Sequence, residues 1–168
     1  MAVVNALEAK NLFKVFGRSP KQAVSRLKAG QSRADVVDAG TAAVIDASFT
    51  VQRGEIFVIM GLSGSGKSTI IRMLNGLLEP TAGEVIVQGQ NVTKASAAEL
   101  RAIRRASVSM VFQHFALLPH RTVIDNAAYA LEVQGIAKPE RLRRARDILE
   151  KVGLGDRADA YPDELPGG

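Results

Sequence analysis

The pattern of apolar and polar positions predicts alternating strands and helices along the chain. Strands are expected where apolar residues alternate or run together, and helices where they recur every three to four residues. The predicted strands cover residues 7–16, 44–51, 55–60, 85–87 and 107–112. The predicted helices cover residues 20–29, 32–39, 70–77, 97–105, 123–133 and 139–152. This order predicts an α/β fold.

Two of the predicted strands differ in pattern. Residues 55–60 form a nearly continuous apolar run, which is typical of a strand buried on both faces in a parallel sheet. Residues 44–51 alternate instead, and this alternation is expected to place one set of side chains on a common face. That set is Ile45, Ala47, Phe49 and Val51.

Residues suited to the two ends of helices support the predicted boundaries. Ser19 precedes a proline and is expected to cap a helix that ends at Gly30. Ser96 and Glu99 have the spacing of a capping box, and Gly153 is suited to end the last long helix.

Composition narrows the classes of protein that fit. There is no cysteine, and no apolar run approaches the roughly 18 residues that a membrane-spanning helix needs. The first residues do not resemble a secretory signal, so a cytosolic location is expected. The net charge is +5, but the cations are interspersed with acids along predicted helices. Solvated helix faces are therefore preferred over a nucleic-acid surface, while an acidic partner or a lipid surface remains open.

The strongest chemical signal is the segment from Gly61 to Thr69, which fits the pattern G-x-x-x-x-G-K-[ST]. It lies between a predicted buried strand and a predicted helix, as a phosphate-binding P-loop requires. The alternative is a glycine-rich turn with an incidental lysine, which this context disfavours. Nucleotide binding is therefore predicted, with contributions from Gly61, Ser63, Gly64, Ser65, Gly66, Lys67, Ser68 and Thr69.

Each residue type in this segment has a physical role. The glycines let a phosphate chain approach the backbone N–H groups, and the following helix directs the positive end of its dipole at the same anion. Lys67 is expected near the β- and γ-phosphates, and the Ser68 hydroxyl is expected to bind Mg²⁺.

Two later segments resemble the ATP-binding cassette (ABC) ATPases. Gln113 follows a predicted strand and resembles the glutamine of the family's Q-loop. Residues 161–168 resemble the approach to the family signature Leu-Ser-Gly-Gly. The resemblance is closer still to one branch, the ATPase subunits of glycine betaine/proline (quaternary-amine) importers. It is carried by residues 54–63, 74–75, 79–81 and 111–120, and by an insert between Phe16 and Val44.

The resemblance implies an incomplete P-loop NTPase core with an antiparallel β-subdomain and part of a helical subdomain. Residues 1–113 would form the first part of the nucleotide-binding core, with a helical insert at about 18–41. Residues 114–168 would belong to the helical subdomain.

The resemblance also implies a function: coupling of Mg-ATP binding and hydrolysis to solute uptake. ATP and Mg²⁺ would be the cofactors, with Gln113 and Ser68 in the magnesium network. The implied partners are a second ATPase subunit in a head-to-tail dimer, transmembrane permease subunits and an extracytoplasmic substrate-binding protein, with no nucleic acid. The implied location is the cytoplasmic face of the plasma membrane.

Further residues have two interpretations each. Phe16 matches the family's adenine-stacking aromatic, or it packs under the sheet. Several residues after Gln113 are coupling residues facing the permease, or helical-subdomain core, with equal support: Phe115, Leu117, Leu118 and Pro119. His114 and His120 receive no catalytic role.

The chain departs from the family pattern at its end. Pro166 stands where the signature has serine, and it offers neither a hydroxyl nor a backbone N–H. No general base is assigned, because the family's Walker B strand and catalytic glutamate would follow Gly168. We therefore hypothesise that the chain is a fragment of a transporter subunit, which would fold poorly or bind nucleotide weakly. A non-hydrolysing nucleotide-binding remnant, and a soluble ABC ATPase acting on nucleic acid, remain as alternatives.

Overall fold

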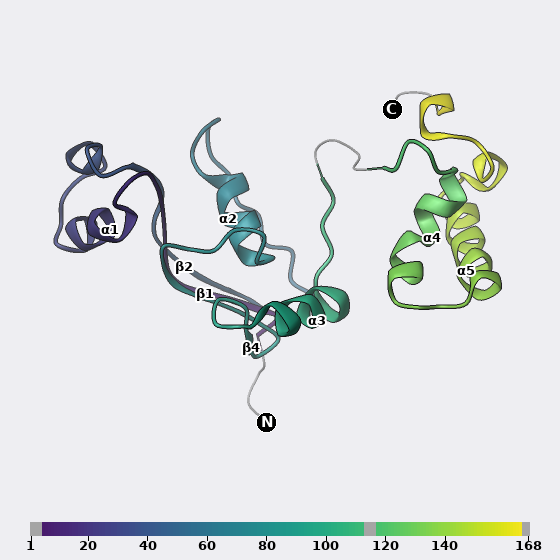
Figure 1. Ribbon diagram of the computed structural model, residues 1–168, viewed down its shortest axis with the longest axis horizontal. Helices are drawn as coiled ribbons and strands as arrows, with labels where there is room; N and C mark the ends of the chain where they lie inside the picture. The colour runs from purple at the N-terminus through teal and green to yellow at the C-terminus, as the bar shows by residue number, and fades with distance from the viewer. Residues whose placement is uncertain (1–4, 113–116, 166–168) are drawn as a thin grey trace. The chain divides into compact units, whose positions relative to one another are not determined.

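The computed structural model describes residues 5–112 and 117–165. The chain divides into two compact units, Met1–Met110 and Val111–Gly168. Within these described residues, the first unit contains the sheet and three α-helices, and the second contains two α-helices (Figure 1).

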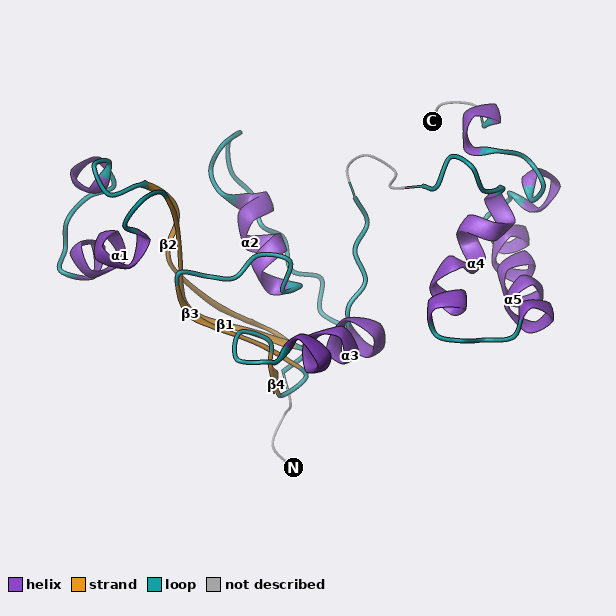
Figure 2. Cartoon of the chain, viewed as in Figure 1, coloured by secondary structure: helices purple, strands orange, loops and turns teal. Residues whose placement is uncertain are grey.

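The sheet of the first unit has four strands in the order β2-β1-β3-β4 (Figure 2). Their bounds are Leu7–Phe16 for β1, Thr41–Val51 for β2, Ala82–Val87 for β3 and Gln90–Asn91 for β4. Every neighbouring pair is antiparallel. The long strands β1 and β2 pair along most of their length, from Leu7 opposite Val51 to Phe16 opposite Thr41.

The helices of the first unit pack around two separate apolar clusters. The insert between β1 and β2 holds α1 (Pro20–Lys28) and the short 3-10 turn η1 (Ala34–Val36). Their apolar residues pack on Phe13 and Val15 of β1. Helices α2 (Lys67–Leu74) and α3 (Ala97–Ser107) belong to the other cluster, in which Leu12, Met73 and Val85 are fully buried.

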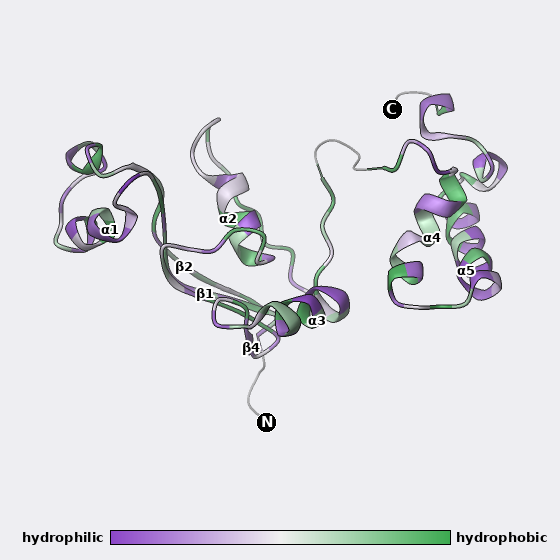
Figure 3. Cartoon of the chain, in the orientation of Figure 1, coloured by the Kyte–Doolittle hydropathy of each residue, from purple (hydrophilic) through white to green (hydrophobic). Residues whose placement is uncertain are grey.

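The second unit is built on α4 (Val123–Val133) and α5 (Lys138–Lys151), followed by the short turns η2 (Gly155–Arg157) and η3 (Pro162–Glu164). Its core contains apolar residues of both helices and of the segment after α5, namely Val123, Ile124, Ala128, Ala145, Leu149 and Ala158. Hydrophobic and hydrophilic residues alternate along the ribbon of α5, as an amphipathic helix requires (Figure 3).

Several sequence predictions are confirmed within the described residues. The strand at 7–16 and the helix at 123–133 have the predicted bounds. The capping box forms: Glu99 N–H donates to Ser96 Oγ at 3.3 Å, and Ser96 N–H donates to the Glu99 carboxylate at 2.8 Å. Ser19 takes the N-cap position of α1, but its side chain makes no capping hydrogen bond.

The predicted strands at 55–60 and 107–112 are wrong. Neither segment is a strand in the part of the chain that the structure describes, and α3 extends to Ser107. Ile56 is 91% exposed and Val111 is 97% exposed, so the apolar runs are not buried. A strand requires a neighbour that satisfies its backbone groups, and the strands of the described sheet pair only with one another. Phe57 nevertheless stacks on Phe49 of β2, with ring centroids 4.8 Å apart.

The predicted alternation along β2 is wrong at Ile45, which is exposed, whereas Ala42 and Val44 are buried. The cause is an irregularity at Asp46, whose φ of 49° is left-handed. The register steps by two residues on β1 but by three on β2 at this point, so one extra residue of β2 reverses the side that each side chain faces.

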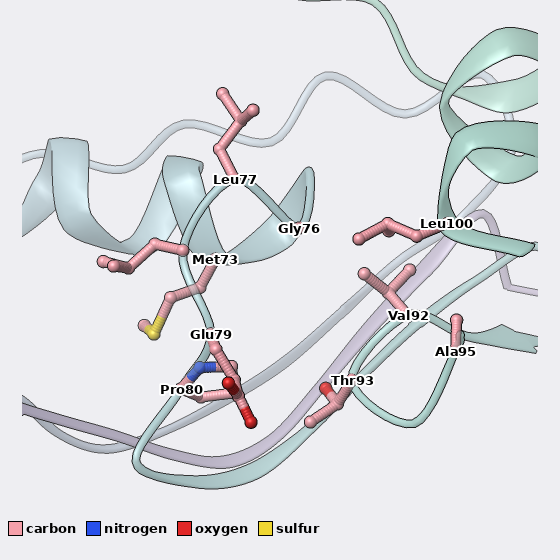
Figure 4. Close-up of a pocket in the computed structure, with 10 residues that line it drawn as sticks. Met73, Gly76, Leu77, Glu79, Pro80, Val92, Thr93, Ala95 and Leu100 are labelled. Carbon is pink, nitrogen blue, oxygen red and sulfur yellow. The ribbon is translucent and has the colours of Figure 1, made fainter. Parts of the chain in front are cut away.

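A cavity of about 400 Å³ lies beside the segment that follows α2. Met73, Leu77, Val92 and Leu100 are among its lining residues (Figure 4). A β-carbon on Gly76 would come within 2.7 Å of the Leu100 side chain, so this segment approaches α3 closely. Among the residues described, no helix has both the length and the apolar character needed to cross a membrane.

Candidate functional site

The glycine-rich segment forms a loop that leads directly into α2. Ser65 N–H donates to the Leu62 carbonyl at 3.2 Å, which tightens the turn. Gly64 and Gly66 have φ values of 76° and 94°, in the left-handed region that side chains disfavour. Gly66 is the N-cap of α2, so the helix begins as soon as the loop ends.

The loop packs against the sheet at Gly66. A β-carbon added to Gly66 would lie 2.4 Å from the carbonyl oxygen of Ala43 in β2. Real side chains do not tolerate that distance, so glycine is required here for contact as well as for backbone conformation. The sheet therefore fixes where α2 begins.

Lys67 folds back over the loop. Its ammonium group donates to the carbonyl oxygens of Gly61 at 2.8 Å and Leu62 at 2.7 Å, and lies 3.5 Å from Ser65 Oγ. A lysine ammonium has three N–H donors. Two are committed to the loop, and the third, at the longest distance, can turn toward an incoming anion.

The first turn of α2 offers further donors. No side chain caps it, and it contains no acidic residue that would compete for an anion. The N–H groups of a helix's first turn lack intrahelical acceptors, and the helix dipole adds positive potential there. Ser68 is exposed in this turn and Thr69 is half-buried, while Ser63 is exposed in the loop. The arrangement is suited to binding the phosphate groups of a nucleotide.

Phe16 lies at the end of β1, opposite Thr41 of β2. Thr41 is two residues from Ala43, a distance of about 7 Å along a strand. The ring is 46% exposed, so it is not packed fully under the sheet. The sheet thus brings an exposed aromatic ring close to the loop at Gly66.

Other predicted residues lie in or beside the segments that the structure leaves out. Gln113, His114, Phe115 and Pro166 are outside the described residues. Leu117, Pro119 and His120 are exposed, and Leu118 is half-buried and donates its N–H to Asn126 Oδ1 at 2.8 Å. Over residues 5–112 and 117–165, no three acidic or histidine side chains gather as a metal site. Mg²⁺ that binds chiefly through nucleotide phosphates does not need such a cluster.

Sequence reasoning missed residues that support this region. Lys14 lies over the Phe16 ring, with its ammonium nitrogen 5.1 Å from the ring centroid. Gly17 and Gly40 meet at the base of the insert, where a β-carbon on Gly17 would be 2.5 Å from Gly40 Cα. The available signal was the period of two along β1, which places Lys14 and Phe16 on one face of the strand.

Comparisons with curated proteins agree with the geometry. The ATP-binding protein ProV of the glycine betaine/proline betaine transport system of Salmonella typhimurium is 52% identical over 96% of this chain. The glycine betaine transport ATP-binding protein OpuAA of Bacillus subtilis is 48% identical over 96% of this chain. The chain spans 41% of ProV and 39% of OpuAA, about two fifths of these relatives. The predicted resemblance to the glycine betaine branch is confirmed.

A solved structure agrees as well. A dimeric ATP-binding cassette in a post-hydrolysis state, bound to ADP and Pi, superposes with a TM-score of 0.76 and 27% identity. The match covers 95% of this chain and 63% of that chain. The predicted fold class, a partial α/β cassette core with an antiparallel sheet, is confirmed.

The family comparison covers the P-loop, part of the first unit and the whole second unit. The family model described as ABC transporter matches residues 44–168, which is most of the chain. The match includes the loop, α2 and all of the second unit. The chain therefore belongs to the ABC transporter family.

Proposed function

We propose that this chain binds Mg-ATP at residues 61–69 and is part of the ATP-binding subunit of an importer for glycine betaine- or proline-type compatible solutes. The observation that carries the proposal is the joint placement of Lys67 and the uncapped first turn of α2 around one glycine-rich loop. Family membership adds weight, because it selects ATP-driven transport among the many uses of a P-loop.

Each candidate residue would hold a different part of the nucleotide. The loop N–H groups and the first turn of α2 would bind the phosphates, and the Lys67 ammonium would neutralise the β- and γ-phosphate charge. Ser68 presents an exposed hydroxyl suited to Mg²⁺, and Gln113 would join the network of magnesium and attacking water. Phe16 would stack on the base. The nucleotide itself supplies the phosphoanhydride bond whose hydrolysis drives transport.

The extent of the matches supports the solute class. ProV and the trimethylamine N-oxide transport ATP-binding protein TmoW of Ruegeria pomeroyi both align with 96% of the chain. The methionine import ATP-binding protein MetN of Rhizobium johnstonii, with 52% identity, aligns with only 77%. MetN is as identical to the chain as ProV is, but its match covers less of the chain. The longer matches therefore favour the transport systems for methylated amines.

The proposed partners follow from this assignment. They are a second ATPase subunit, permease subunits and an extracytoplasmic binding protein, with the chain at the cytoplasmic face of the membrane. The unit Met1–Met110 would belong to the nucleotide-binding core and Val111–Gly168 to the helical subdomain.

The charged face of α5 bears on whether nucleic acid is a partner. Arginines of α5 bind acids of the same helix, as in the pairs of Arg143 and Arg144 with Glu140. Such neutralised pairs favour a solvated face over a nucleic-acid surface.

Binding measurements test the proposal. Titration calorimetry of the 168-residue chain with Mg-ATP should show binding that Lys67→Ala weakens at least tenfold. Lys94→Ala is the matched control, because Lys94 pairs with Glu84 on the surface, away from the loop. Absence of binding, or unchanged binding in Lys67→Ala, would overturn the assignment of the site.

Release of phosphate separates the leading proposal from its main alternative. Mg-ATP binding without phosphate release, alone or with the permease subunits, would favour a non-hydrolysing nucleotide-binding remnant. Phosphate release that rises when the permease subunits and the solute-loaded binding protein are present would support the transport ATPase.

A further inference from the structure

Lys14 joins two parts of the first unit that are distant in sequence. Its ammonium nitrogen lies 5.1 Å from the centroid of the Phe16 ring, and it donates to the backbone carbonyl of Glu79 at 2.7 Å. Lys14 and Phe16 are two residues apart on β1, so both side chains leave the same face of the strand. One side chain therefore contacts the aromatic ring and the backbone of another segment.

The segment that receives this bond is fixed at both ends. At its start, Leu78 N–H donates to the Arg72 carbonyl of α2 at 2.9 Å. At its end, Thr81 N–H donates to the Phe13 carbonyl at 2.8 Å, and Val15 N–H donates to Thr81 Oγ1 at 3.0 Å. Glu79 and Pro80 follow closely on the end of α2 (Figure 4). These bonds tie the segment that carries the Glu79 carbonyl to both α2 and β1.

We propose that Lys14 is a positioning residue for the nucleotide base, because it holds the Phe16 ring in a fixed position relative to α2. The inference rests on the proposed function, in which Phe16 stacks on the base. A cation over one face of the ring restricts the ring's rotamers and leaves the opposite face for a planar ligand. A ring that is already ordered loses less conformational entropy when the ligand binds.

The test separates the base from the phosphates by using two probes, Mg-ATP and Mg-tripolyphosphate. In Lys14→Met the affinity for ATP should fall about three- to tenfold, the range expected when binding must order one side chain that was ordered before. The affinity for tripolyphosphate should not change, because the loop and Lys67 are untouched. Lys14→Arg keeps a cation and a donor, so it should retain most of the ATP affinity.

A matched control is available at another aromatic ring of β1, which a lysine of α1 covers. Lys28 lies over the ring of Phe13 at 5.4 Å, but Phe13 is buried. Lys28→Met removes the same kind of contact from a ring that cannot stack on a ligand, and both affinities should stay unchanged. Lys67→Ala should weaken both probes together.

The outcomes distinguish the two proposals. If the natural chain binds neither probe, the proposed nucleotide site fails. If it binds both, but Lys14→Met lowers both equally or neither, the positioning role is wrong while the site stands. Unfolding temperatures of the variants check the fold. If Lys14→Met does not fold, Lys14→Gln, which keeps a donor for the Glu79 carbonyl, gives the same comparison without a cation.

Discussion

Gly66 of the P-loop lies against the backbone carbonyl of Ala43 in β2, where a β-carbon would come within 2.4 Å of the oxygen. Ala43 belongs to the part of β2 that pairs with Val15 and Phe16 of β1. The start of α2 and the exposed ring of Phe16 are therefore both referenced to one short stretch of sheet. Any side chain at position 66 would push the start of α2 away from β2 and so change the distance between the proposed base and phosphate sites.

The first prediction is that Gly66→Ala removes nucleotide binding and destabilises the first unit by at least about 2 kcal/mol. The methyl group would meet the Ala43 carbonyl, and alanine would be strained at a φ of 94°. Urea unfolding measures the stability, and calorimetry with Mg-ATP measures the binding.

Gly64→Ala is the matched control for this substitution. Gly64 also has a left-handed φ, of 76°, but a β-carbon there would meet nothing within 4 Å. It should cost only the backbone term of about 1–2 kcal/mol. Equal losses of stability in the two variants would show that the contact with Ala43 is unimportant.

The elements predicted correctly from sequence are those whose cause is local. The capping box at Ser96 and Glu99 is such a case, since both partners lie within one turn of α3. The glycine-rich segment 61–69, a loop that runs into the start of α2, is another, because its glycines and lysine act over nine consecutive residues. The apolar run at 55–60 reads like a buried strand, yet strand formation depends on a distant neighbour that no local pattern reveals.

The irregularity of β2 could not be predicted from the sequence either. Asp46 has a φ of 49°, and its carboxylate accepts a hydrogen bond from Asn11 Nδ2 at 2.9 Å. Asn11, on the paired strand, is itself left-handed with a φ of 45°. Two residues 35 positions apart set this register together, so a simple alternation rule fails at Ile45.

The second prediction follows from that irregularity. Asp46→Val should destabilise the first unit by about 2 kcal/mol, because a β-branched residue is strained at left-handed φ and the bond from Asn11 is lost. Asp46→Gly removes the same bond but relieves the strain, so its cost should stay below about 1 kcal/mol. Urea unfolding of the two variants would give similar losses if the backbone were regular here.

The third prediction concerns residues 55–60, which are mostly exposed and are not part of a strand. Ile56→Asn should change the unfolding free energy by less than about 0.5 kcal/mol, as expected at a surface position. Met73→Ala, at a fully buried position, should cost about 2–5 kcal/mol. Hydrogen exchange gives a second readout: the amides of residues 56, 58 and 60 should exchange far faster than those of β1. Slow exchange in this segment would indicate that it pairs as a strand.

The fourth prediction is a pH dependence of the second unit. Hydrogen bonds from Arg143 and Arg144 lower the pKa of the Glu140 carboxyl to about 2, from an ordinary value of 4.5. A carboxyl with a lower pKa in the folded state contributes stability above its unfolded pKa and loses that contribution as the pH falls toward the folded value. The loss should therefore occur between about pH 4.5 and pH 2.

Replacing the carboxylate isolates this contribution from the other acids that titrate in the same range. Glu140→Gln should flatten the decline in unfolding temperature between pH 4.5 and pH 2, because glutamine has no proton to gain. Glu150→Gln, at another exposed position of α5, should leave the decline closer to that of the natural chain, since the two arginines bind Glu140 instead. The effect should also shrink at high salt, because exposed ion pairs are screened. An identical pH profile for the natural chain and Glu140→Gln would mean that the arginine pairs at the start of α5 do not stabilise the helix.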